Sequence, residues 1–206
     1  MGQCRSSFSV LVLGLGGSGK STLLRGIEAS SLHEDRGKNT SVTTPAPTFA
    51  HDHTTVRLPS GITLFFDEFP SNSQSRATWA EFFPKRDALV WVMDVSDSST
   101  HEESIQLLGE VLNGKGEDKG ISPQTLVIIF LNKLDIWLAG GNKDGRPLEK
   151  TLRRSIKALG APHTFRYTWN CAKLTESCKN FALALADDIA EHKDPLLVRM
   201  SRRVLS

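Results

Sequence analysis

The stretch Gly14-Leu-Gly-Gly-Ser-Gly19-Lys20-Ser21 decides the fold class of this 206-residue chain. It follows a strand-like apolar run over 8–13 and precedes a helical stretch that starts at Lys20. A glycine-rich turn between a strand and a helix directs backbone N–H groups and the positive helix N-terminus at bound phosphates. In this pattern the lysine reaches the terminal phosphates and the serine hydroxyl binds Mg²⁺. The predicted phosphate-binding residues are Gly14, Gly16, Gly17, Ser18, Gly19, Lys20, Ser21 and Thr22.

Short apolar runs alternate with helical stretches along the rest of the chain. The strand-like runs lie at 8–13, 54–58, 62–66, 88–93, 126–131 and 164–169, and the helical ones at 20–30, 103–112, 148–159 and 174–190. Pro59-Ser60-Gly61 separates the second and third runs and predicts a hairpin. This alternation predicts a three-layer α/β fold of the P-loop NTPase type. Its sheet is six-stranded and mostly parallel, with one antiparallel hairpin strand and helices on both faces.

Composition predicts one domain with short extensions. Residues 33–47, 113–123 and 139–147 are rich in glycine, proline or charge and are expected to be loops. We assign 7–192 to the domain, 1–6 to an N-terminal segment and 193–206 to a tail.

Charge and cysteine content exclude several classes of protein. The chain carries 25 Lys and Arg against 23 Asp and Glu, so a net charge of +2 argues against a nucleic-acid-binding chain. Three cysteines without a pattern argue against a disulfide framework and for a reducing compartment. No apolar run approaches the roughly 20 residues of a membrane-spanning helix.

A second motif indicates which base the nucleotide carries. Asn132-Lys133-Leu134-Asp135 directly follows the apolar run at 126–131, so it is expected at the ligand-binding edge of the sheet. An aspartate there can accept two hydrogen bonds from guanine N1–H and its exocyclic amine, whereas adenine offers no such pair of donors. The motif therefore predicts guanine binding by Asn132, Lys133 and Asp135.

With both motifs, the chain resembles the Ras-like small GTPases, and most closely the Arf and Arf-like family, over about residues 7–192. The resemblance implies GTP or GDP as ligand, Mg²⁺ as cofactor, effectors and regulators bound through the switch regions, and a monomer. It places Cys171, Ala172 and Lys173 at the third base-recognition element. It implies that Thr48 closes onto Mg²⁺ from switch I and that Asp67 holds Mg²⁺ through water, so the metal set is Ser21, Thr48 and Asp67.

Switch II departs from the family pattern Asp-x-x-Gly-Gln, since the chain reads Asp67-Glu68-Phe69-Pro70-Ser71. Pro70 then replaces the glycine whose N–H contacts the γ-phosphate, and proline has no N–H. Ser71 is shorter than the glutamine that orients the attacking water. Gln74 follows three residues later, so Ser71 and Gln74 are the candidate catalytic residues. We expect weak or absent hydrolysis and weakened GTP sensing.

Histidines near switch I raise the question of a further metal site. His51 and His53 alternate on an expected edge strand, where they share one face. Because no matching acidic or cysteine partner is evident, a solvated strand face is the favoured interpretation over a metal site.

Both chain ends carry signals for membrane attachment. Gly2 and Ser6 fit the N-myristoylation pattern, and Cys4 is a candidate palmitoylation site. One myristoyl chain anchors only marginally, so a second signal is needed. The tail carries a net +3 and would be amphipathic if helical, although a solvated tail is an equal alternative. We expect attachment to the cytosolic face of a membrane.

Three functions remain open at this point. The leading hypothesis is a membrane-associated guanine-nucleotide switch or scaffold in intracellular trafficking. The second is a hydrolysis-competent small GTPase with a non-standard or partner-supplied catalytic group. The third is a P-loop kinase of small molecules, which leaves the 132–135 motif unexplained.

Overall fold

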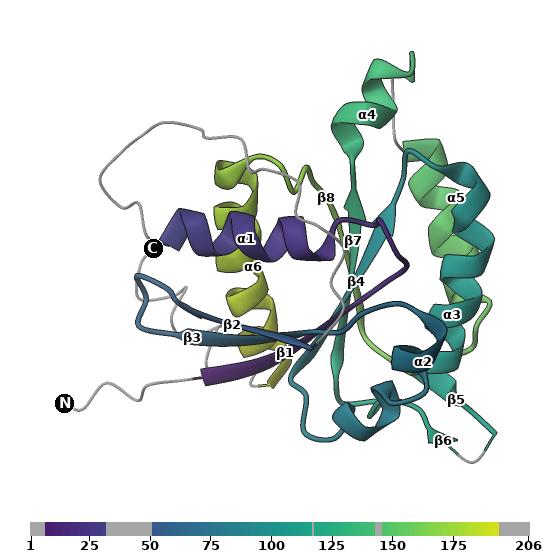
Figure 1. Ribbon diagram of the computed structural model, residues 1–206, viewed down its shortest axis with the longest axis horizontal. Coiled ribbons are helices and arrows are strands. Elements are labelled where there is room, and N and C mark those ends of the chain that lie inside the picture. The colour runs from purple at the N-terminus through teal and green to yellow at the C-terminus, as the bar shows by residue number, and fades with distance from the viewer. Residues whose placement is uncertain (1–6, 32–50, 117, 143–145, 194–206) are drawn as a thin grey trace.

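The computed structural model describes residues 7–31, 51–116, 118–142 and 146–193. At its centre lies a six-stranded sheet in the order β2-β3-β1-β4-β7-β8 (Figure 1). Its strands are β1 (Ser7–Leu13), β2 (Asp52–Arg57), β3 (Thr63–Glu68), β4 (Ala88–Asp94), β7 (Leu126–Asn132) and β8 (Phe165–Trp169).

The strand directions match the predicted fold class. β2 pairs antiparallel with β3, and every other neighbouring pair in this sheet is parallel. The carboxyl ends of the parallel strands therefore meet at one edge, where open α/β sheets bind their ligands. The prediction of a mostly parallel sheet with one antiparallel hairpin strand is confirmed.

Helices cover both faces of the sheet (Figure 1). α1 (Lys20–Ser31) and α6 (Thr175–Lys193) pack on one face, and α3 (His101–Asn113) and α5 (Arg146–Lys157) on the other. Alternation along β1 supplies both layers, since Val10 and Val12 enter the α1/α6 core whereas Leu11 and Leu13 enter the α3/α5 core.

Several short elements lie where the sequence predicted none. They are α2 (Ser73–Arg76), the 3₁₀ turns η1 (Trp79–Phe82) and η2 (Ser98–Thr100), α4 (Leu134–Ala139), and the hairpin strands β5 (Gly114–Lys115) and β6 (Asp118–Lys119). The hairpin occupies part of the expected loop at 113–123. Helices this short carry too few periodic positions to be recognised in a sequence.

The two ends of the described domain meet. The Lys193 ammonium pairs with Asp87, just before β4, and lies 5.5 Å from the centroid of the Phe8 ring in β1. Both ends therefore lie at the amino-terminal edge of the sheet, opposite the ligand-binding edge. The predictions for Gly2, Cys4, Thr48 and the tail beyond Lys193 fall outside the described residues. Within the described part of the chain, no helix combines the length and apolar character needed to cross a bilayer.

Candidate nucleotide-binding site

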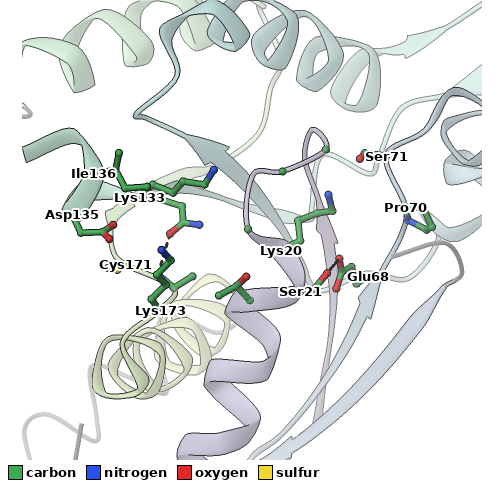
Figure 2. A pocket seen from close by; sticks show the side chains of 16 residues that line it. Lys20, Ser21, Glu68, Pro70, Ser71, Lys133, Asp135, Ile136, Cys171 and Lys173 are labelled. Carbon is green, nitrogen blue, oxygen red and sulfur yellow. Dashed lines mark hydrogen bonds between the residues drawn. The ribbon is translucent and has the colours of Figure 1, made fainter. Parts of the chain in front are cut away.

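A pocket of about 310 Å³ opens at the carboxyl edge of the sheet (Figure 2). Asp135, Ile136, Cys171 and Lys173 gather on one side of it, and Ser21, Glu68, Pro70 and Ser71 on the other, with Lys20 between them. The full lining is Gly16, Gly17, Gly19, Lys20, Ser21, Thr22, Glu68, Pro70, Ser71, Asn132, Lys133, Asp135, Ile136, Cys171, Ala172 and Lys173.

Two glycines of the predicted phosphate loop are required by close packing. A Cβ on Gly14 would stand 2.3 Å from the Val92 carbonyl oxygen, and a Cβ on Gly19 would stand 2.2 Å from Asn132 Nδ2. Both residues also have positive φ, at 146° and 97°. These two glycines let the loop pass close to β4 and β7, whereas Gly16 and Gly17 line the pocket itself. Gly14 and Ser18 belong to the loop but do not line this pocket.

Lys20 is a buried cation inside the loop. Its ammonium donates to the carbonyl oxygens of Gly14 at 3.1 Å and Leu15 at 3.0 Å. Burial lowers the pKa of Lys20 from 10.5 to about 8, and the nearby Glu68 carboxylate opposes that shift. The nearby Arg76 charge lowers this pKa further. A buried cation in this setting suits an anionic ligand, because a phosphate would stabilise its charge.

The carboxylate beside the loop is Glu68, which corrects the expectation for Asp67. Ser21 Oγ donates to Glu68 Oε1 at 2.6 Å, and Glu68 is only 1% exposed. Asp67 does not line the pocket. The reason is strand alternation: β3 turns Glu68 toward α1 and turns its neighbour Asp67 to the opposite face of the sheet.

Asp67 instead joins a polar cluster on that opposite face. Its Oδ1 lies 2.9 Å from His51 Nε2 and 2.9 Å from His53 Nδ1, and its other oxygen pairs with Arg86. Although burial opposes it, hydrogen bonds from the two histidines and the Arg86 charge hold the pKa of Asp67 below its usual range. The two histidines therefore have a carboxylate partner that the sequence did not reveal. Among the described residues, no group of three or more His, Cys, Asp or Glu side chains is arranged to hold a metal ion.

The correction at Glu68 shifts the switch II alignment by one residue. Counted from Glu68, the glycine position of the family pattern falls on Ser71 and the glutamine position on Asn72. Ser71 lies against the loop, because a Cβ on Gly16 would stand 3.4 Å from Ser71 Oγ. Pro70 therefore no longer replaces the glycine, and the argument that its missing N–H weakens GTP sensing falls away.

Neither side chain at or near the glutamine position points into the pocket. Asn72 is exposed and caps α2, where its Oδ1 accepts from the Ser75 N–H at 2.9 Å. Gln74 is exposed on α2 and does not line the pocket. Ser71 is thus the one predicted catalytic candidate that the structure brings to the site.

Asn132 connects three parts of the pocket. Its Nδ2 donates to the Ser18 carbonyl at 2.8 Å, and its Oδ1 accepts from the Ala172 N–H at 3.0 Å. Asn132 is 2% exposed. From the end of β7, Asn132 therefore connects the phosphate loop to the 171–173 segment. The sequence predicted that Asn132 belongs to the site but did not reveal this bridging role.

The predicted base-recognition residues lie together. Lys133 adopts a left-handed conformation, with φ 64°, and its ammonium lies 2.5 Å from Asp94 Oδ2. Asp135 and Cys171 are neighbours; burial raises the pKa of the Cys171 thiol, and the Asp135 carboxylate adds to the rise. Ile136 provides an apolar side chain beside them. Ile136 was not predicted as a site residue, and its position directly after the 132–135 motif is the only signal for it in the sequence.

This arrangement defines the class of protein. A phosphate loop between β1 and α1, on a mostly parallel sheet with helices on both faces, is the P-loop NTPase fold. The model of the ADP-ribosylation factor family matches residues 1–159, and the chain belongs to this family of Ras-like small GTPases.

Individual relatives agree with this assignment. The chain is 30% identical to the small COPII coat GTPase SAR1 of Giardia intestinalis over 68% of its length and 64% of that relative's length. It is 32% identical to the ADP-ribosylation factor-like protein 3 of Chlamydomonas reinhardtii, over 62% and 63% of the two chains. The matches thus span less than two thirds of these curated relatives.

A solved structure shares the fold. The Arl6/BBS3 small GTPase of Trypanosoma brucei, bound to the nucleotide analogue GppNp, superposes with a TM-score of 0.68 at 18% identity. The match covers 91% of this chain and 99% of that one.

Proposed function

We propose that this protein is a guanine-nucleotide-binding switch or scaffold of the Arf type. One observation carries the proposal: a single pocket brings together the phosphate loop, the 132–135 motif and the 171–173 segment, which lie far apart in sequence. Lys20 and the loop N–H groups would bind phosphates, and the Asp135 carboxylate would accept from guanine.

The donor set beside Lys20 fits Mg²⁺. Ser21 and Glu68 offer a hydroxyl and a carboxylate, and Mg²⁺ prefers oxygen ligands. Bound there with phosphate, the ion would neutralise phosphate charge. Ser21 and Glu68 are therefore the proposed holding residues among those described, in place of Ser21 and Asp67.

We expect intrinsic GTP hydrolysis to be weak. The residue at the glutamine position, Asn72, is one methylene shorter than glutamine, and its amide oxygen is engaged as the cap of α2. A single-turnover assay with labelled GTP tests this point. Hydrolysis at ordinary small-GTPase rates would favour the alternative of a competent enzyme with a non-standard catalytic group.

Membrane attachment is proposed through Gly2, Cys4 and the basic tail. Phe8 and Lys193 lie close together, so segments leaving either end of the domain start at the edge opposite the pocket. Fractionation of the wild type, Gly2→Ala and a deletion of 194–206 tests this. Reduced membrane recovery in both variants is expected, and unchanged recovery in both contradicts it.

The resident nucleotide is the decisive measurement for the whole proposal. Protein purified without added nucleotide should release GDP or GTP on denaturation, identified by chromatography. Asp135→Asn, which replaces an acceptor oxygen with a donor amide, should lower guanine-nucleotide affinity at least tenfold. Binding of ATP in preference to GTP would instead support a small-molecule kinase.

A further inference from the structure

Helix α5 (Arg146–Lys157) carries an unusual concentration of positive charge. Five of its twelve residues are cationic, namely Arg146, Lys150, Arg153, Arg154 and Lys157, against one acidic residue, Glu149. The helix therefore carries +4, whereas the whole chain carries +2, so the remainder carries −2 (2 − 4). The positive charge is localised rather than spread over the surface.

The five cations share one face of the helix. At 3.6 residues per turn, their positions fall within an arc of about 100° and extend along about 17 Å of the axis. All five are exposed. We call this surface the α5 basic stripe.

Most of the stripe has no acidic partner. Within the described ranges, Lys150, Arg154 and Lys157 make no ion pair. Glu149 sits at the margin of the stripe, where its carboxylate contacts Arg153 at 2.5 Å and also Trp169 Nε1. The charges of these three neighbouring cations are therefore solvated by water and not neutralised by a carboxylate of the described residues.

The orientation of the stripe is set by the core. Leu152 and Ile156, on the opposite side of the helix, are 3% and 1% exposed and belong to the α3/α5 core. Most of the stripe therefore points away from the sheet, whereas Arg153 at its margin lies 3.8 Å over the ring of Tyr167 in β8. None of its residues lines the nucleotide pocket, so binding to it leaves the nucleotide site open.

We propose that the α5 basic stripe binds an acidic helical segment of a partner protein. Lys150 and Arg154 lie four residues apart, about 6 Å along the axis, and Lys157 lies about one turn further along the same side. Carboxylates one turn apart on an acidic helix have the same spacing. Arginine side chains pair with carboxylates through two parallel hydrogen bonds, and Arg154 at the centre of this row is an arginine.

Two other anionic partners fit the observations less well. Phe8 and Lys193, at the two ends of the domain, lie close together at one edge of the sheet. Helix α5, which carries the stripe, instead covers a face of the sheet beside α3 (Figure 1). A flat membrane held at those ends would not lie along the stripe. For nucleic acid, the chain lacks a large positive charge. The aromatic rings beside the stripe are already engaged, since Arg153 covers Tyr167 at 3.8 Å and Trp169 donates to Glu149.

The test compares two charge reversals in the full-length protein. One variant carries Lys150→Glu, Arg154→Glu and Lys157→Glu. The matched control carries Arg199→Glu, Arg202→Glu and Arg203→Glu in the tail. The probe is a 16-residue alanine-based helical peptide with glutamate at every fourth position, together with its glutamine counterpart, and binding is followed by fluorescence anisotropy at several salt concentrations.

We expect the wild type and the tail variant to bind the glutamate peptide within twofold of each other and the α5 variant at least tenfold more weakly. Binding should weaken with salt, and the glutamine peptide should not bind. Equal affinities of the two variants overturn the proposal. So does an α5 reversal that abolishes binding to phosphatidylserine vesicles or to a duplex oligonucleotide while the peptide is still bound. Retained GDP binding by both variants shows that the fold and the nucleotide site are intact. Loss of peptide binding with GDP binding retained therefore concerns the α5 basic stripe and not the proposed switch function.

Discussion

At the scale of single residues, one step along β3 determines the chemistry of the pocket. Asp67 and Glu68 are both acidic, and their order in the sequence does not reveal which one faces the phosphate loop. The structure turns Glu68 to Ser21 and gives Asp67 to Arg86 and two histidines. The two carboxylates can therefore be separated experimentally.

Glu68→Gln should weaken the Mg²⁺ dependence of nucleotide binding, because it removes the charge beside Ser21. We expect nucleotide dissociation from this variant to change less than twofold between Mg²⁺ and EDTA, measured with a fluorescent GDP analogue. Asp67→Asn is the matched control and should keep the wild-type response to EDTA. The reverse result would return the metal position to Asp67.

Asp94 gives a prediction about pH. Burial alone would raise the pKa of Asp94, but hydrogen bonds from Lys133 and Ser96 outweigh it and hold this pKa below its usual range. A lowered folded-state pKa contributes stability that is present above about pH 4 and is lost as pH falls through the lower value. Asp94→Asn should cost about 1.5–3 kcal/mol at pH 7 and lose less stability than wild type between about pH 4 and 2, measured by urea denaturation. Asp97→Asn is the matched control and should cost less at pH 7, because asparagine can still accept the cap hydrogen bond from the Ser99 N–H.

At the scale of elements, the pocket depends on how separate segments are joined. The phosphate loop follows β1, and the 171–173 segment follows β8, on either side of β7. Asn132 bridges them at the end of β7 with two buried hydrogen bonds. The site is therefore a property of three strand ends held in register.

Asn132→Ala should destabilise the fold as well as the site. It leaves the Ser18 carbonyl and the Ala172 N–H without their partner in a buried place, which costs about 2–4 kcal/mol in the free energy of unfolding. Nucleotide affinity should fall at the same time. Asn170→Ala removes one long bond of 3.4 Å to Ser177 and serves as control, with a cost of about 1 kcal/mol or less. Equal losses in the two variants would contradict the bridging role.

At the scale of the molecule, one sheet separates two cores that belong to a single folding unit. Ile27 of α1 is 0% exposed in one core, and Ile156 of α5 is 1% exposed in the other. These two side chains do not contact the same residues, since the sheet lies between their two cores. Their contributions to stability are therefore expected to be independent.

Ile27→Val and Ile156→Val should each cost about 0.5–1.5 kcal/mol in the free energy of unfolding. The double variant should lose the sum of the two within about 0.5 kcal/mol, because the sites are distant and share no contacts. Denaturant unfolding of the four proteins measures this, and one transition is expected throughout. Two transitions would show that the layers unfold separately.

How far the sequence could be interpreted depended on how local each signal was. The phosphate loop, the 132–135 motif and the long strands are contiguous patterns, and the structure places all of them as expected. Glu68 was missed because β3 ends in two consecutive acidic residues, Asp67 and Glu68, whose side chains lie on opposite faces of the sheet. Only the position of α1 shows which of the two faces the phosphate loop. The short helices α2 and α4 were missed because they lack a full period.

The sequence by itself determined the layered α/β fold, since strand and helix periodicity and the glycine-rich turn are local properties of the chain. It also determined the family, because the family motifs and their spacing can be recognised in the sequence alone. Only the tertiary structure decided that Glu68 faces Ser21 and that Asn132 bridges two loops. It also decided that Lys150, Arg154 and Lys157 lie exposed on one side of α5, with no ion pair among the described residues. These features depend on which side chains from distant segments meet, and that is set by packing across the sheet.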